Sequence, residues 1–235
     1  MSNKELRVKA LSKIKHDNFS GLSAAAYAIA ALPLLLGDIT GIKLADIAIT
    51  FAAAFIAALF CAAGYVRVAM GRWRFTKGGF RDLACCFTEW NTFVRSALPC
   101  AVYAGMITVF RHVVMTGGWI TAAIVGVCLI FVHLFVSYAL YGCELCPEKG
   151  PIKAAMTGVA TAVKGMGAIL EMKIYVYWWI AGLIAIIMYC CISGKQPGFI
   201  TALIVFLVVL IPRWMVGAYI ALCEAGLART LFKQE

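Results

Sequence analysis

The feature that most constrains this chain is a long apolar run near its C-terminal end. Phe199–Cys223 is 25 residues long and carries one charged residue, Arg213, directly after an internal proline, Pro212. A helix needs about 20 apolar residues to cross the hydrocarbon core of a bilayer, so this run predicts a membrane span. The other long apolar runs of the chain are then expected to be its neighbours in the membrane.

The composition predicts the same class of protein. Hydrophobic residues make up 63% of the 235 residues, and the mean hydropathy is +0.91, which is far outside the range of soluble domains. The chain has 21 Lys and Arg against 11 Asp and Glu. Because these positive charges flank the apolar runs, we expect them to contact a lipid bilayer with anionic headgroups and not nucleic acid. Met1–Asn18 lacks a signal-peptide pattern, so the first apolar run is expected to be retained.

The pattern of apolar runs predicts an all-α, polytopic protein with one domain, residues 1–235. Short turns alternate with longer basic segments between the runs. Lys and Arg number 5 before the first run and 2 after the last, with 1, 5, 1, 4 and 1 between them when Arg111 is counted with the turn after it. The positive-inside rule therefore places both termini in the cytoplasm. The six expected spans are residues 19–36, 45–70, 96–115, 119–141, 174–192 and 199–223.

Two cytoplasmic segments are expected to form helices at the membrane surface. Residues 83–95 predict a short interfacial helix, after which Pro99 falls in the first turn of a span, where proline is tolerated. Residues 152–172 have apolar side chains every three or four positions, which predicts an amphipathic helix lying flat, with Met156 and Val163 facing the bundle or the lipid. The residues expected to contact the membrane surface are Lys153, Lys164, Arg72, Arg74 and Trp73.

Several motifs together resemble a known family. In chain order they are Gly64–Met70 with Gly79–Leu83, then Tyr138–Gly165, then Pro212 followed by Tyr219–Glu224. They resemble the bacterial integral-membrane family catalogued as domain of unknown function nine-seven-five, over nearly the whole chain. The family typically has Ser-x-x-Leu-Met-Lys-Gly before its fifth span and Pro-Tyr in its last span. This chain instead has Ala160–Gly165, without the serine and methionine, and Pro212-Arg213. The resemblance implies a divergent, six-span protein of the bacterial cytoplasmic membrane and implies no activity.

Arg213 is the main candidate for a binding residue. It lies about 10 residues, or roughly 15 Å, from the expected cytoplasmic end of its span, where an unpaired arginine costs several kcal/mol. Pro212 leaves a backbone carbonyl without its helical partner, so the pair predicts an anion or headgroup site. The alternative is an arginine that only fixes packing. His133, at a similar depth in its own span, is a second candidate, with a simple hydrogen bond to a neighbouring helix as the alternative.

No pattern of catalytic or metal-binding residues is found. Cys143-x-x-Cys146 and the vicinal pair Cys85-Cys86 are both expected in the cytoplasm, but vicinal cysteines are poorly spaced for a metal and no histidine lies nearby. The sequence contains no phosphate-binding loop, zinc-protease motif or nucleophile elbow. We therefore predict no cofactor, no metal and no catalytic residue, and an enzyme is the less expected class.

The sequence is compatible with two classes of function. Two groups of three spans in opposite orientations are typical of small transporters, so we expect a transport or transport-accessory component for a small or amphiphilic compound. Such a short chain is expected to act as a homo-oligomer or with a partner membrane protein. The alternative is a non-transporting scaffold that binds lipid or a partner. A polar cavity near the membrane midplane would favour transport, whereas closely packed helices with Gly and Ala at their crossings would favour a scaffold.

Overall fold

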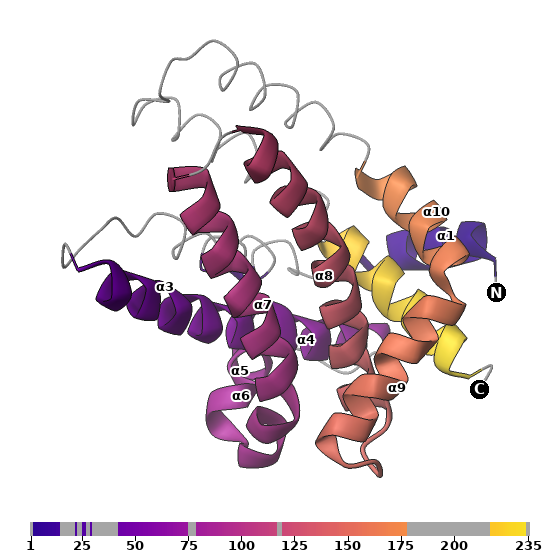
Figure 1. Ribbon diagram of the computed structural model, residues 1–235. Helices are drawn as coiled ribbons and strands as arrows, with labels where there is room; N and C mark the ends of the chain where they lie inside the picture. Colours follow the sequence, from indigo (N-terminus) through magenta and orange to yellow (C-terminus); the bar gives the residue numbers. More distant parts are fainter. Residues whose placement is uncertain are drawn as a thin grey trace.

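The computed structural model describes residues 2–14, 22, 25–26, 29, 42–74, 79–116, 119–177 and 217–233. The ordered elements in these ranges are helices, as the apolar pattern predicts, and Figure 1 shows their arrangement. In chain order they are α1 (Asn3–Ile14), α3 (Lys43–Ala58), the π-helix η1 (Leu59–Gly64), α4 (Tyr65–Trp73), α5 (Phe80–Leu83), α6 (Cys85–Thr88), α7 (Trp90–Thr116), α8 (Trp119–Leu145), α9 (Pro151–Lys164), α10 (Met166–Tyr177) and residues 217–232.

Three helical segments are long and apolar enough to cross a membrane. They are Lys43–Trp73, Trp90–Val113 and Ile124–Leu145. The shortest has 22 residues, which at 1.5 Å per residue gives about 33 Å, close to the thickness of a hydrocarbon core. They coincide with the spans expected at 45–70, 96–115 and 119–141. The other three expected spans lie largely outside the described residues, so the count of six stays a prediction.

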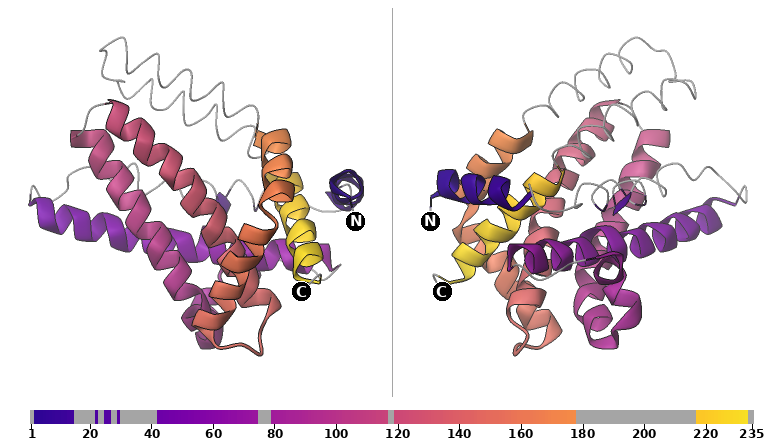
Figure 2. Two further views of the ribbon diagram at one scale, coloured as in Figure 1. Left: turned by 45° about the vertical axis from the view of Figure 1, so that its right-hand side comes forward. Right: turned by 180° about the vertical axis from the view of Figure 1, so that it is seen from behind.

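The first of these segments is one continuous helix with a π-helical stretch inside it. It runs across α7 and α8, which lie side by side (Figures 1 and 2). The π-helix η1 ends at Gly64, whose backbone touches the carbonyl group of Leu83. A Cβ atom at Gly64 would lie 1.9 Å from that oxygen. The glycine therefore lets the α5 backbone pack directly on η1.

The start of α7 differs from the expected one. In place of a single interfacial helix over 83–95, the chain forms α5 and α6, and α7 begins at Trp90. Pro99 thus lies in the helix interior and not in the first turn. A proline there cannot donate to the carbonyl four residues earlier, but the Cys143 thiol donates to that Arg95 carbonyl oxygen at 3.2 Å. Since a neighbouring helix supplies the missing donor, α7 continues through the proline.

α8 and α9 pack closely because glycines occupy their contact. A Cβ atom at Gly142 would lie 2.3 Å from the Ala154 carbonyl oxygen, and one at Gly158 would lie 2.1 Å from that of Tyr138. Close backbone contact through small residues is a common way for helices to associate in lipid. The α9 face that packs on α8 is formed by small residues, namely Ala154, Ala155, Gly158, Thr161 and Ala162.

In the helix predicted over residues 152–172, the small residues therefore decide which side packs on α8. This helix is broken at Gly165 into α9 and α10. The large apolar side chains face outward, with Met156 63% and Val163 58% exposed. Of the two sides predicted for them, bundle or lipid, they lie on the side away from the described bundle. Small residues let the α9 backbone approach α8, which leaves the larger side chains outside.

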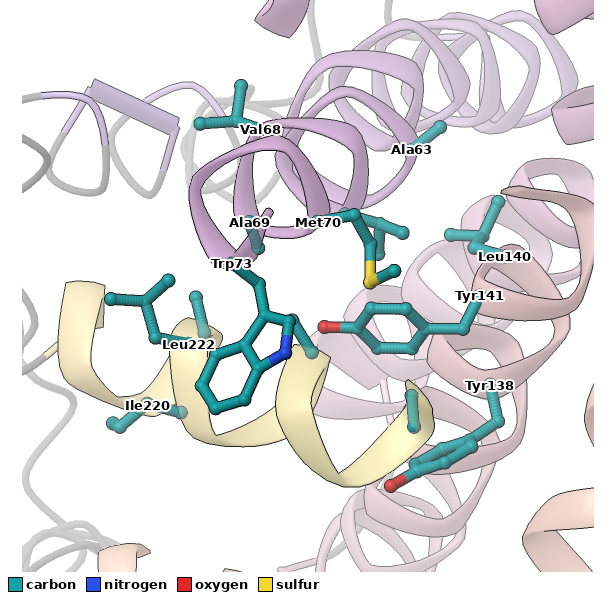
Figure 3. Close-up of a cluster of buried hydrophobic side chains, with 14 of the residues drawn as sticks. Ala63, Val68, Ala69, Met70, Trp73, Tyr138, Leu140, Tyr141, Ile220 and Leu222 are labelled. Carbon is teal, nitrogen blue, oxygen red and sulfur yellow. The ribbon is translucent and has the colours of Figure 1, made fainter. Parts of the chain in front are cut away.

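The two terminal helices, α1 and residues 217–232, lie near each other at the end of α4 (Figure 2). The Trp73 ring, which is 6% exposed, packs between them, and Figure 3 shows it beside Ile220 and Leu222. A Cβ atom at Gly226 would lie 2.6 Å from the ring. The C-terminal helix continues beyond the expected end of the span at Cys223, and Glu224 of this helix forms an ion pair with Lys173.

Lys13 of α1 completes this contact. Its ammonium group donates to the Trp73 carbonyl oxygen at 2.5 Å, at the end of α4 where backbone carbonyls lack helical partners. Lys9 and Lys13 also lie 5.2 Å from the centroid of the Trp73 ring. Burial lowers the pKa of Lys13, and the charges of Lys9 and Arg229 lower that pKa further. The N-terminal helix is thus anchored to the bundle by a partly desolvated charge.

Candidate functional site

A polar pocket of about 330 Å³ lies where α4, α7 and α8 meet. It is placed near one end of each of the three apolar segments, in the last part of the first, at the start of the second and at the end of the third. Small and apolar side chains form part of its wall, and charged and polar groups the rest. Its lining residues are Ala63, Val66, Arg67, Glu89, Asn91, Thr92, Arg95, Ser96, Leu140, Cys143, Glu144 and Pro147.

Arg67 and Glu89 form a bidentate ion pair on one wall of the pocket. The Nη1 atom of Arg67 lies 2.7 Å from one carboxylate oxygen of Glu89, and its Nη2 atom lies 3.0 Å from the other. Thr92 accepts a hydrogen bond from Arg67 at 2.9 Å and donates one to Glu89 at 2.8 Å. Glu89 has an extended backbone between α6 and α7. The break between these helices therefore positions the carboxylate opposite Arg67 of α4.

Hydrogen bonds and nearby charges make Glu89 a stronger acid than usual. The hydrogen bond from Thr92 lowers the pKa of the Glu89 carboxyl most; burial opposes this, and the hydrogen bond and charge of Arg67 lower the pKa further. About half of the Glu89 side chain remains exposed. Exposed ion pairs contribute less than about 1 kcal/mol to stability, so this pair shapes the pocket more than it stabilises the fold.

Arg95 holds the end of α8 and the following loop by four hydrogen bonds. Its Nε atom donates to the Cys143 carbonyl oxygen at 3.1 Å, and its Nη2 atom donates to that of Cys146 at 2.7 Å. Its Nη1 atom donates to the carbonyl oxygens of Pro147 at 3.1 Å and Lys149 at 2.9 Å. The last carbonyls of a helix have no helical partner and carry partial negative charge. A planar, fully charged guanidinium group is well suited to bind several of them at once.

Glu144 lies on the opposite wall, one residue before the end of α8. Its side chain is half-buried, and the charges of Arg67, Arg74 and Arg95 attract it. No hydrogen bond or ion pair of its carboxylate is formed with any residue that the structure describes. A carboxylate at a helix C-terminus is also opposed by the helix dipole. Glu144 is thus the charged group of the pocket whose bonding capacity is unused.

The cysteines near the pocket are buried thiols. Cys143 lies in the last turns of α8 and Cys146 directly after it, in the segment that Arg95 binds, and Cys85 and Cys86 lie in α6. A hydrogen bond between the vicinal thiols raises the pKa of Cys85 and lowers that of Cys86. Among the described residues, no group of three or more His, Cys, Asp or Glu side chains is arranged to hold a metal ion. The arrangement is that of packed thiols next to a polar pocket.

Of the residues predicted for binding, the structure describes His133, which does not line this pocket. Pro212 and Arg213 lie outside the described residues, so their site stays a prediction. His133 lies in α8 with its ring 5.4 Å from that of Tyr103 in α7. It precedes Glu144 by 11 residues, or about 16 Å along a helix. Its role in binding also stays a prediction.

The residues predicted to contact the membrane surface have different surroundings. Lys153 and Lys164 are exposed on α9, Arg74 is exposed after α4, and Arg72 is half-buried. Trp73 is inside the fold, where the terminal helices and two lysines cover its ring. A place at the end of an apolar helix therefore does not by itself put a side chain on the surface.

The four charged residues of the pocket were not singled out from the sequence. Arg67 and Glu89 are separated by 22 residues in the chain, and Arg95 binds carbonyls 48 to 54 residues further on. The only local signal is that Arg67 and Glu144 are charges close to the ends of apolar runs. Comparison of the chain with protein-family models, with characterised proteins and with solved structures found no match.

Proposed function

We propose that the protein is a multi-pass protein of the bacterial cytoplasmic membrane that binds the polar head of an amphiphilic compound, as a small transport or transport-accessory component. The observation that carries this proposal is the pocket between Arg67, Glu89, Arg95 and Glu144, at the ends of three apolar helical segments. The ends of spans lie where hydrocarbon gives way to headgroups and water. A polar pocket at that depth suits a headgroup better than a fully apolar ligand.

The surface of α7 next to the pocket offers a place for an apolar tail. Asn91 lines the pocket, and Val94, Leu98 and Val102 follow at intervals of three and four residues, on the same side of the helix. These three side chains are exposed in the described structure. An amphiphile with its head in the pocket would place its tail along this apolar stripe, in contact with lipid.

α9 supports the assignment to a membrane surface. Its outward side carries the exposed apolar side chains Ile152, Met156 and Val163, with Lys153 and Lys164 also exposed. Large apolar side chains next to lysines are typical of a helix side that contacts lipid near the headgroups and attracts anionic lipids. α9 has 14 residues, or about 21 Å of helix, which is too short to cross a bilayer.

The alternative is a scaffold that binds lipid or a partner protein without moving it. The backbone contact of Gly142 with α9 and of Gly158 with α8 favours this alternative, because such tight crossings resist opening. The pocket also lies at the helix ends and not halfway along the segments. A lipid-binding scaffold would share the binding site with a transporter and would differ only in whether the bound amphiphile crosses the membrane.

A photo-crosslinking experiment tests the binding site. The full chain in lipid nanodiscs is irradiated with an amphiphile that carries a photoreactive group next to its head, and the labelled peptides are identified by mass spectrometry. We expect adducts in residues 89–96 and 140–147, which line the pocket. Adducts spread evenly over the apolar helices would contradict the proposal. Flip or release of the same amphiphile across proteoliposome membranes then separates transport from the scaffold function.

A further inference from the structure

The pocket contains equal numbers of arginines and glutamates, but their bonding capacities are not equally used. Arg67 directs three donor contacts to Glu89 and Thr92. Arg95 directs four to backbone carbonyls. A guanidinium group has five N–H donors, so most donors of both arginines are already occupied. An anionic ligand would therefore meet arginines that have little left to offer.

Glu144 is in the opposite situation. It lines the pocket, and no hydrogen bond or ion pair of its carboxylate is formed within the described part of the chain. Burying a charge costs free energy unless the charge is paired, and its place at the C-terminal end of α8 adds an unfavourable interaction with the helix dipole. Arg67 and Arg95 attract it from beyond ion-pair distance. Both arginines are held in place by their other bonds.

We infer that the pocket recognises an ammonium headgroup and that Glu144 is the carboxylate that binds it. This inference rests on the proposed function and names the class of compound. A primary ammonium group has three donors. Two can bind the Glu144 oxygens, and the third can bind an oxygen of Asn91, Thr92 or Ser96, which line the same pocket.

The size and walls of the pocket agree with this assignment. About 330 Å³ is within the range of pockets that hold small ligands and is ample for an ammonium group with a few carbons. Ala63, Val66 and Leu140 offer apolar contact for the carbons next to the nitrogen. Such a head occurs both in lipids with an ethanolamine headgroup and in free long-chain amines. The shared chemistry is an ammonium group on an apolar chain.

The test compares matched amphiphiles on the full chain in a neutral detergent at pH 7. Dodecylamine and dodecyl phosphate are titrated separately, and binding is followed by the shift in thermal unfolding temperature. Glu144→Gln should weaken dodecylamine binding at least tenfold. Glu148→Gln is the matched control, because it makes the same chemical change four residues later at an exposed side chain outside the pocket. Its dodecylamine affinity should equal that of the unmodified protein.

A second variant guards against loss of folding. Glu144→Asp keeps the charge but withdraws it by one methylene group, so its dodecylamine affinity should lie between those of the unmodified protein and Glu144→Gln. Without ligand, Glu144→Gln should unfold at the same temperature as the unmodified protein or higher, since an unpaired carboxylate is removed. A markedly lower unfolding temperature would show that Glu144 is a structural group and would overturn the inference.

The remaining outcomes separate this inference from the proposed function. Equal binding of dodecylamine to the unmodified protein and Glu144→Gln would overturn the inference. Binding of dodecyl phosphate but not of dodecylamine would also overturn the inference, although the proposed amphiphile site would still stand. Binding of neither compound would overturn both proposals. Retention of phosphatidylethanolamine over phosphatidylglycerol from mixed vesicles, lost in Glu144→Gln, would support a lipid source. Dodecylamine binding without that lipid preference would support a free amine.

Discussion

Replacing Arg95 should destabilise the protein more than replacing any exposed arginine. Three of its four hydrogen bonds are partly buried and one is exposed. A hydrogen bond to a charged donor contributes about 1.5–3 kcal/mol when buried, and partial exposure reduces this to about 1 kcal/mol for each of the three. Arg95→Ala should therefore lower the free energy of unfolding by about 3 kcal/mol. For a chain of this size that corresponds to about 6–12 °C in unfolding temperature.

The shape of the guanidinium group is tested by a second substitution. Arg95→Lys keeps the positive charge near the α8 C-terminus. A single ammonium nitrogen, however, cannot reach the four carbonyl oxygens that the three nitrogens of the planar guanidinium group bind. We expect Arg95→Lys to retain about 1 kcal/mol of the roughly 3 kcal/mol that Arg95 contributes to the free energy of unfolding. The remaining loss of about 2 kcal/mol corresponds to an unfolding temperature about 4–8 °C lower. The measurement is thermal unfolding of the full chain in one detergent, followed by tryptophan fluorescence.

Arg81→Ala is the matched control. Arg81 is exposed in α5 and forms no hydrogen bond with any residue that the structure describes, so its loss should change the free energy of unfolding by less than about 0.5 kcal/mol. An Arg95→Lys protein with the same unfolding temperature as the unmodified protein would refute the reasoning, because the positive charge alone would then account for the stabilisation. Equal losses for Arg95→Ala and Arg81→Ala would refute it as well.

Four further predictions concern packing, pH, topology and the last span. Gly158→Ala should lower the unfolding temperature, because the new methyl group would meet a carbonyl oxygen at 2.1 Å, whereas Gly167→Ala, which has nothing within 4 Å, should not. The pKa of Glu89 is lowered in the fold by a threonine hydroxyl and an arginine. The small stabilisation from Glu89 is therefore present above its unfolded pKa near 4.5 and lost as the pH falls through its folded pKa, and Glu89→Gln should flatten that part of the unfolding profile. An alkaline phosphatase fusion at Gly117 should be active, because this enzyme needs disulfides that form only outside the cytoplasm; a fusion that is produced but inactive would contradict the charge pattern. Arg213→Leu should abolish function but leave the unfolding temperature unchanged or raised if Arg213 serves a site, whereas loss of folding would make it a packing residue.

The spans that the structure describes could be predicted because their signal is local. Each of 45–70, 96–115 and 119–141 needs only a run of apolar residues long enough for a bilayer, and hydrophobicity is a property of the residues themselves. The boundaries were harder. The helix boundary at Trp90 was missed because Pro99 suggested a first turn, and only a thiol from α8, 44 residues after the proline, lets the helix pass through it.

Orientation of the surface segments depended on their neighbours. The period of residues 152–172 identified an amphipathic helix, but the apolar stripe alone did not say which residues would pack. Gly142 and Gly158 decided it by allowing backbone contact, which turned Met156 outward. Trp73 has the local pattern of an interfacial aromatic residue, yet lysines of α1 and the C-terminal helix cover its ring.

The sequence by itself determined the helical class, three apolar helices and the basic segments between them, since these follow from composition and period. The tertiary structure alone decided the pocket. Arg67 reaches Glu89 across a helix break, and Arg95 binds carbonyls of α8 and its loop. Hydrogen bonds and ion pairs require atoms within about 3 Å. Residues distant in the chain reach that separation only through the packing of whole helices, which no local pattern records.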